Sequence, residues 1–143
     1  MHKVEITMSA NVSAEKIWQV LKDFGGFLNW ARLDGGEILV EGDGIGMIRH
    51  LKTDVGEIGE QLTALDNDSR QIGYQITYGE PIGMKSYEAL VTVNATGNNI
   101  CEINWSGIFA PVDPETTKQV ETALSDSYQK MHLALESYTL MVP

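Results

Sequence analysis

Apolar and polar residues alternate along much of the chain, which is the period of a β-strand with one face toward water. Residues 3–10 alternate in this way, and the pattern returns in residues 71–78, 87–94 and 101–109. In the stretch 71–78, the residues predicted to point inward are Ile72, Tyr74, Ile76 and Tyr78. Turns rich in Gly, Asn and Asp separate these stretches. The pattern predicts one N-terminal strand and a later meander of six strands.

The last stretch of the chain has a helical period instead. From Val120 to Tyr138 the apolar residues recur every three or four positions, and no Gly or Pro interrupts them before Pro143. Asp113 can serve as N-cap and Pro114 suits the first helical position. A helix from Asp113 to about Leu140 would be roughly 40 Å long. Because a one-sided helix of this length needs a broad apolar surface, we expect the strands to form a sheet that curves around it.

Two shorter helices are predicted between the first strand and the meander. Ser13 can cap a helix that runs to Phe24, and Gly25-Gly26 would end it. Residues 27–30 predict a second, very short helix. The predicted order is therefore one strand, two helices, six strands and one long helix. This order describes a single α+β domain over residues 1–143, with a curved antiparallel sheet wrapped around the C-terminal helix.

The turns of the meander predict how its first strands pair. Taking Asp43-Gly44 as a two-residue turn pairs Val40 with Met47 and Ile38 with Arg49. A turn near residues 53–56 pairs Lys52 with Glu57, which places Leu51 opposite Ile58 and Arg49 opposite Glu60. The face of the sheet that should be apolar therefore contains two opposite charges.

Composition and charge exclude several classes of partner. The 143 residues carry 10 Lys and Arg against 20 Asp and Glu, a formal charge of −10. Nucleic acids and anionic membrane surfaces both favour clustered positive charge, so neither is an expected partner. No apolar run is long enough to insert into a membrane, and the first ten residues do not resemble a signal peptide. With one cysteine and no internal disulfide, the expected location is the cytoplasm.

Four groups of residues carry a family resemblance: Ser13-Ala14-Glu15-Lys16-Ile17-Trp18 with Asp23-Phe24 and Trp30; Gly42-Asp43-Gly44-Ile45-Gly46-Met47-Ile48-Arg49; Glu60-Gln61-Leu62 with Leu65-Asp66; and Arg70 with Tyr74. In their order and spacing, and with the long last helix, they resemble the helix-grip superfamily (SRPBCC). That superfamily contains the polyketide cyclase/dehydrase-like and lipid-transport proteins, the START domains and the Bet v 1 allergens. The resemblance covers nearly the whole chain.

The resemblance implies a cavity between the curved sheet and the last helix for an apolar or amphipathic small molecule. In the plant abscisic acid receptors of this superfamily, two loops close over the ligand. Gly79-Glu80-Pro81 resembles one of these loops, whereas residues 53–56 depart from the other. The superfamily includes enzymes, carriers and sensors, so the fold alone selects no function.

Arg49 and Glu60 are the most informative candidates for chemistry. Burial of a charge pair costs several kcal/mol per ion and is repaid only with good geometry. In a functional interpretation, Arg49 anchors a carboxylate or enolate of the ligand and Glu60 orients it or acts as general base. In a structural interpretation, the pair is a cross-strand bridge that fixes the register of two strands. The sequence leaves both open.

Aromatic residues add further candidates for ligand contact. Tyr74, Tyr78, Tyr87 and Trp105 fall on the inward face by parity, and Tyr128 and Met131 lie on the apolar side of the last helix. Aromatic rings with a polar handle can stack on a flat ligand and bond its oxygens, although each can equally belong to the core.

The remaining reactive residue types predict no metal site and no cofactor. His50 is out of phase with Arg49 and should point away from the cavity, and His132 should lie at the margin of the last helix's apolar side, partly exposed. Cys101 is expected to be a small core residue. Leu133 and Leu140 should face away from the sheet, where they offer a modest surface for a homodimer.

The function that these patterns favour is binding or carriage of an apolar or aromatic small molecule, such as a lipid or a polyketide-like compound. One alternative is an enzyme of the polyketide cyclase/dehydrase type that uses Glu60 and Arg49. A further alternative is a ligand sensor that acts through a partner protein.

Overall fold

The computed structural model of the protein describes residues 1–31, 36–54 and 56–142. Its elements, in chain order, are β1 (His2–Ala10), α1 (Ala14–Leu21), the 3-10 turn η1 (Phe24–Gly26), α2 (Phe27–Trp30), β2 (Glu37–Glu41), β3 (Ile48–Thr53), β4 (Gly56–Asp66), β5 (Gln71–Tyr78), η2 (Pro81–Gly83), β6 (Met84–Gly97), β7 (Ile100–Pro111), η3 (Pro114–Thr116) and α3 (Thr117–Met141). The predicted order of strand, two helices, six strands and long helix is confirmed.

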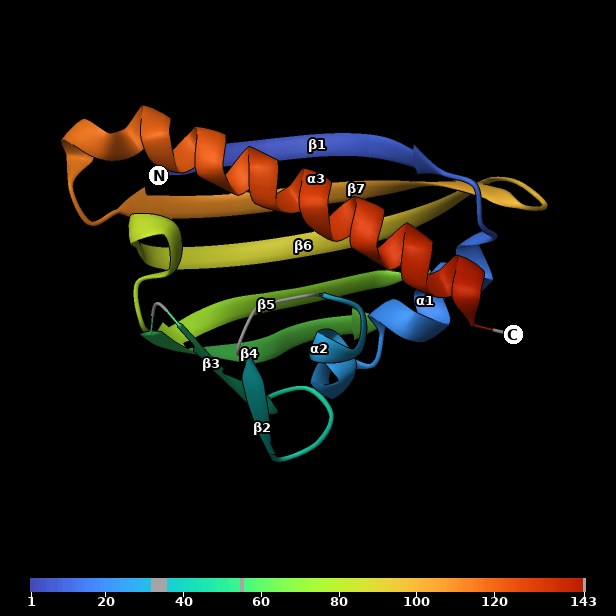
Figure 1. Ribbon diagram of the computed structural model, residues 1–143, viewed down its shortest axis with the longest axis horizontal. Coiled ribbons are helices and arrows are strands. Elements are labelled where there is room, and N and C mark those ends of the chain that lie inside the picture. The colour runs from blue at the N-terminus through green and yellow to red at the C-terminus, as the bar shows by residue number, and fades with distance from the viewer. Residues whose placement is uncertain (32–35, 55, 143) are drawn as a thin grey trace.

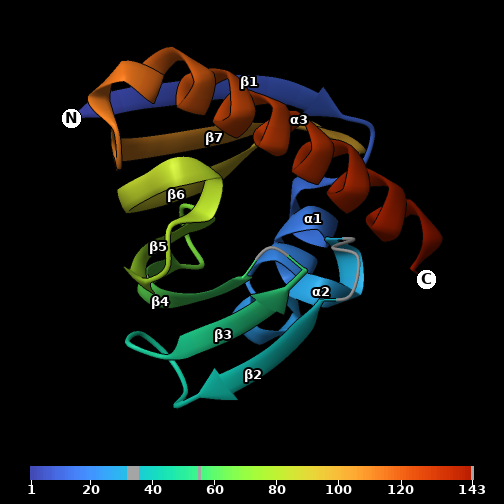
Figure 2. The same ribbon diagram turned by 60° about the vertical axis from the view of Figure 1, so that its left-hand side comes forward.

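The seven strands form one antiparallel sheet in the order β1-β7-β6-β5-β4-β3-β2. From β2 to β7, strands that are consecutive in the chain are neighbours in the sheet, and β1 lies at the edge beside β7 (Figure 1). The sheet curves strongly, so that β2 and β3 turn back beneath the helix (Figure 2). This curvature produces a hollow inner face for α3 to cover.

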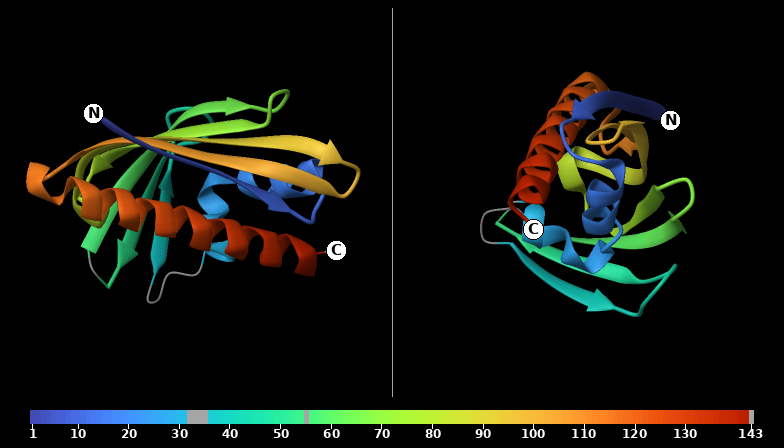
Figure 3. Two further views of the ribbon diagram at one scale, coloured as in Figure 1. Left: turned by 90° about the horizontal axis from the view of Figure 1, so that it is seen from above. Right: turned by 90° about the vertical axis from the view of Figure 1, so that its right-hand side faces the viewer.

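Helix α3 covers the inner face over the length of the sheet (Figure 3). Its buried residues recur every three or four positions: Val120, Leu124, Tyr128, His132, Leu135 and Thr139. The helix begins later than predicted, because Asp113 caps a 3-10 turn by accepting from the backbone N–H of Glu115 at 3.0 Å, and α3 starts only at Thr117. No helix in the described parts of the chain is long and apolar enough to span a membrane.

One of the two predicted strand registers differs in the structure. The β2–β3 hairpin pairs Val40 with Arg49, two residues away from the predicted pairing, because the connection from Gly42 to Met47 is longer than a two-residue turn. A slip of two residues keeps every side chain on its predicted face. The β3–β4 pairing agrees with the prediction, with Arg49 opposite Glu60. Val55, in the predicted turn between these strands, lies outside the described residues.

A bulge between β4 and β5 changes the face of the last β5 residue. Glu60 pairs with Ile76 but Gly59 pairs with Tyr78, so one residue of β5 is left over. Tyr78 therefore points to the outer face and is 41% exposed. The prediction that Tyr78 faces inward is wrong, because strict alternation does not anticipate the bulge.

The core fills the end of the molecule where α1 and α2 meet the second half of α3. Its largest fully buried side chains include Trp18, Ile17, Trp105, Ile103 and Leu135. In the first half of α3, the small residues Ala123 and Ser127 face strands β3 to β6. Space is therefore left between that half of the helix and strands β3 to β6.

Candidate functional site

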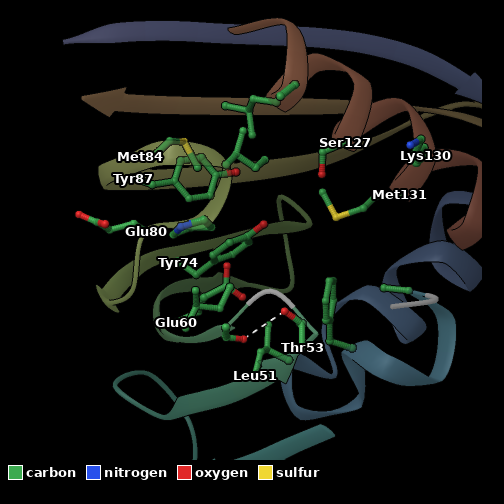
Figure 4. A pocket seen from close by; sticks show the side chains of 18 of the residues that line it. Leu51, Thr53, Glu60, Tyr74, Glu80, Met84, Tyr87, Ser127, Lys130 and Met131 are labelled. Atoms are coloured by element: carbon green, nitrogen blue, oxygen red, sulfur yellow. Dashed lines mark hydrogen bonds between the residues drawn. The ribbon is translucent and has the colours of Figure 1, made fainter. Parts of the chain in front are cut away.

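A cavity of about 1010 Å³ lies between α3 and the inner face of β3 to β6. This volume is at the upper end of the range for small-molecule sites in proteins. Apolar side chains make up much of its wall: Phe27, Ala31, Leu51, Ile58, Met84, Leu124 and Met131. The polar part of the wall comes from the sheet, where Tyr87, Tyr74 and Glu60 follow one another on β6, β5 and β4 (Figure 4). Met131 and Ser127 face them from α3.

Arg49 lies at the end of this polar row, on β3, and is only 4% exposed. Its Nε donates to Oε1 of Glu60 at 2.8 Å, and its Nη1 donates to the backbone carbonyl of Phe24 at 3.1 Å. The guanidinium carbon also lies 3.9 Å, 4.2 Å and 4.9 Å from the ring centres of Phe24, Phe27 and Tyr74. An ion pair with additional hydrogen bonds and three aromatic neighbours is a well-compensated buried charge. The geometry therefore gives Arg49 a structural task, joining η1 and α2 to the sheet.

Glu60 is also buried, but one half of its carboxylate remains available. Oε1 accepts from Arg49, whereas Oε2 accepts no hydrogen bond from the residues that the structure describes. Because Glu60 lines the cavity, this oxygen can accept from a ligand.

Three tyrosine side chains continue the polar row from Glu60 toward α3. The hydroxyls of Tyr87 and Tyr128 are 2.5 Å apart and share a hydrogen bond, and the rings of Tyr74 and Tyr87 meet edge to face with centres 6.2 Å apart. Burial and the nearby negative charge of Glu60 raise the pKa of Tyr74 to about 12, although Arg49 acts in the opposite sense. Burial raises the pKa of Tyr87 well above its ordinary value too. Both phenols are therefore neutral at pH 7 and can donate to a ligand.

Tyr128 and Trp105 support the cavity wall without lining it. Tyr128 is fully buried and its hydroxyl reaches the space above Gly107, where a side chain would collide with it. Trp105 stacks on Tyr128 with ring centres 6.0 Å apart, and is 1% exposed. Both were predicted to contact ligand, but the structure places them in the core, because their rings pack directly against each other where α3 meets β7. Arg49, Glu60, Tyr74, Tyr87 and Met131 do line the cavity.

His132 is buried, and the prediction of a partly exposed histidine is wrong. Its Nδ1 accepts from the indole N–H of Trp105 at 3.2 Å, and its Nε2 lies 2.8 Å from the carbonyl of Ser9. Since an indole only donates and a carbonyl only accepts, the imidazole is the neutral tautomer with its proton on Nε2. His132 thus ties α3 to β7 and β1. Its spacing of four from Tyr128 and three from Leu135 was the sequence signal for burial.

On the outer face, Tyr78 belongs to a small network instead of the cavity. Its hydroxyl is 2.7 Å from Nδ1 of His50, and Nε2 of His50 is 3.2 Å from Glu41. Gly59 lies between Tyr78 and His50 in the sheet, and a side chain there would collide with the tyrosine ring. His50 points away from the cavity, as predicted.

The contacts of Phe24 and Phe27 with Arg49 have no clear signal in the sequence, because these two residues come from a different segment of the chain. At the mouth, Glu80 before η2 and Pro81 and Ile82 within it line the cavity. Glu80 and Pro81 belong to the loop that resembles a ligand-covering loop of the superfamily. Ile82 has a positive φ of 59°, which is unfavourable for a β-branched residue. Within the described residues no three His, Cys, Asp or Glu side chains gather as metal ligands would.

A curved sheet that holds a long helix over a cavity defines the helix-grip class of α+β proteins. The chain belongs to the family described as polyketide cyclase / dehydrase and lipid transport, whose model matches residues 1–138. No functionally curated protein matches the sequence.

Solved structures share the fold at low sequence identity. The protein XoxI from Bacillus cereus is 24% identical with a TM-score of 0.84, covering 99% of this chain and 97% of its own. Norcoclaurine synthase from Thalictrum flavum, solved in complex with dopamine and hydroxybenzaldehyde, is 23% identical with a TM-score of 0.78, covering 99% of this chain and 88% of its own. A protein from Thermobifida fusca is 20% identical with a TM-score of 0.80, covering 96% and 93%. These similarities establish the fold.

Proposed function

We propose that the protein binds or carries an apolar or aromatic small molecule in the cavity between α3 and the sheet. The observation that carries this proposal is the cavity itself, which combines about 1010 Å³ of space with a mainly apolar wall and one row of polar groups. Membership of a family of cyclases, dehydrases and lipid-transport proteins supports it.

The energetics of such a site favour an apolar guest. A ligand that buries about 300 Å² of apolar surface gains roughly 7 kcal/mol from its removal from water, before the cost of immobilisation is subtracted. The hydroxyls of Tyr74 and Tyr87 and the free oxygen of Glu60 would then fix the orientation of its polar end.

Native mass spectrometry before and after organic extraction tests this proposal, with two matched variants. Ala134 lines the cavity, whereas the neighbouring Leu133 is 60% exposed on the other side of α3. We expect a small molecule to accompany the wild type and Leu133→Trp, and to be retained less by Ala134→Trp, whose indole takes up part of the cavity. A compound retained equally by Ala134→Trp would contradict the proposal. So would an extracted protein that releases no compound and takes up none of a panel of lipids and aromatic compounds.

A second candidate is an enzyme of the cyclase/dehydrase type, which the free oxygen of Glu60 favours. In this proposal Oε2 of Glu60 takes a proton from a carbon next to a carbonyl, Arg49 stabilises the resulting enolate, and Tyr74 orients the ring of the substrate. Glu60→Gln should then abolish turnover while it leaves binding intact. Turnover retained in this variant would exclude the mechanism.

A third candidate is a sensor that reports occupancy through the loop at residues 79–85, because Glu80, Pro81 and Ile82 line the mouth. Hydrogen exchange in this loop should then slow when ligand is bound, and unchanged exchange would count against a sensor. A cytoplasmic location, the exclusion of nucleic acid and a homodimer through Leu133 and Leu140 stay predictions.

A further inference from the structure

The charges around the cavity are unequal in number. Among the described residues that line it, the acidic ones are Asp54, Glu57, Glu60, Glu80 and Asp126, and the basic ones are Arg49 and Lys130. Five acids against two bases leave three uncompensated negative charges on the lining. These three charges belong to the mouth, because Glu60 and Arg49 compensate each other at the inner wall.

At the inner wall the group offered to a ligand is an acceptor. The positive charge of Arg49 is matched by Glu60 and covered by the rings of Phe24, Phe27 and Tyr74. By contrast, Glu60 lines the cavity with a side chain that is only 8% exposed, and its Oε2 accepts no hydrogen bond from the described residues. A carboxylate oxygen that accepts no hydrogen bond favours a donor, and a charged donor forms the stronger bond.

At the mouth the acids outnumber the one basic side chain. Asp54 follows β3, Glu57 lies at the start of β4 and Glu80 precedes η2. Asp126 and Lys130 lie one turn apart on α3. All five are exposed, and no ion pair links Lys130 to another described residue. Because clefts lined by one sign of charge concentrate ligands of the opposite sign, this mouth attracts cations and repels carboxylates.

We propose that the cavity selects positively charged ligands: an apolar or aromatic amine whose ammonium group bonds Oε2 of Glu60. The inference rests on the proposed binding function and adds the charge of the ligand to it. The ring of Tyr87 offers a further site for the ammonium group, since aromatic faces attract cations. A fatty acid or another carboxylate would instead bring its charge against Glu60 and past Asp54, Glu57 and Glu80.

Octylamine, 1-octanol and octanoate test the inference because they share one chain and differ in the charge of its end. At pH 7 we expect calorimetry on the extracted protein to give a dissociation constant for octylamine at least about tenfold below that for octanoate, a difference of about 1.4 kcal/mol. The dissociation constant for 1-octanol should lie between these two, since its hydroxyl can donate to Glu60 but carries no charge.

Matched variants assign the preference to the cavity. Glu60→Gln keeps an oxygen that can accept from Arg49 and removes the negative charge. It should weaken the affinity for octylamine by about fivefold or more and change the affinity for 1-octanol little. If Glu60→Gln does not fold, Asp126→Asn at the mouth is a second variant that should weaken the affinity for octylamine. Glu102→Gln removes the same charge from an exposed position of β7 outside the cavity, and should leave the ratio of octylamine to octanoate unchanged.

The possible outcomes separate the two proposals. Octanoate that binds as tightly as octylamine, with octanol also bound, overturns the charge preference and leaves the binding function standing. An equal loss of octylamine affinity in Glu102→Gln also overturns it, because the effect then belongs to net charge. Failure of the folded protein to bind any of the three contradicts the binding function, and the inference with it.

Discussion

Replacing Gly107 with alanine tests the packing of α3 on the sheet beneath the cavity wall. A Cβ at this position of β7 would lie 2.8 Å from Cε1 of Tyr87 and 3.3 Å from Cδ2 of Leu124, and would collide with the hydroxyl of Tyr128. Neither ring can move freely, because both are buried and their hydroxyls share a hydrogen bond. Overpacking of this kind costs about 1–3 kcal/mol, and loss of the hydrogen bond adds about 1 kcal/mol.

We therefore expect Gly107→Ala to lower the free energy of unfolding by about 2–4 kcal/mol, or about 3 °C in melting temperature for each kcal/mol in a chain of this size. Chemical denaturation and calorimetry measure both quantities. Tyr128→Phe alone should cost about 1 kcal/mol, since it removes one partner of the hydrogen bond.

The double variant is the decisive comparison for this contact. Tyr128→Phe removes the oxygen with which the new methyl group collides, so Gly107→Ala should cost about 1.5 kcal/mol less in its presence than in the wild type. Ser106→Ala, at the neighbouring position of β7 on the other face, is the matched control and should change stability by less than about 0.5 kcal/mol. Strict additivity of Gly107→Ala and Tyr128→Phe would refute the close approach of α3 to β7 at this point.

Three further predictions concern buried polar groups. In denaturation experiments, Arg49→Met should lower the free energy of unfolding by about 3 kcal/mol because it leaves Glu60 buried without its partner. The double variant Arg49→Met with Glu60→Leu should recover most of this loss. No recovery would mean that the pair is not coupled. Because burial raises the pKa of Tyr74 from 10.0 to about 12, the native state keeps a proton that the unfolded state loses in this range. The stabilisation that protonated Tyr74 contributes is complete below pH 10 and is lost as pH rises toward 12. The stability of Tyr74→Phe should therefore fall less steeply at alkaline pH. Identical pH profiles would disprove the shift in pKa. His132→Phe should lower the free energy of unfolding by about 2–4 kcal/mol because it leaves the indole N–H of Trp105 and the carbonyl of Ser9 without partners. The control His50→Phe, on the outer face, should lower it by less than about 0.5 kcal/mol. Equal losses would contradict the buried network.

Much of the fold follows from local patterns in the sequence. The alternation in β1, β6 and β7 and the helical spacing in α3 are strong because each element has one buried face and one wet face. The pairing of Arg49 with Glu60 could be predicted because a short turn fixes the register of β3 against β4. The predicted pairing of β2 with β3 is wrong by two residues. Because side chains alternate between the two faces of a strand, Val40 and Ile38 still lie on the predicted face.

The candidate site was less predictable because it depends on tertiary contacts. A bulge opposite Gly59 moves Tyr78 to the outer face, and one extra residue in a strand leaves no clear sequence signal. Phe24 and Phe27 lie far from Arg49 in sequence, so their contact with its guanidinium requires the packing of η1 and α2 on the sheet. The depth of the core around Trp105 and Tyr128 likewise depends on how far α3 stands from β7.

Methyl NMR of the methionine side chains tests the central claim, that the cavity is a small-molecule binding site. Met84 and Met131 line the cavity, whereas Met8 and Met47 lie outside it, and the exposed Met141 is near the C-terminus. During a titration with 1-octanol, which is uncharged, we predict that the methyl signals of Met84 and Met131 shift together and saturate while those of Met8, Met47 and Met141 stay in place. Saturable shifts confined to Met8, Met47 or Met141, with Met84 and Met131 unchanged, would place the binding site elsewhere and contradict the account.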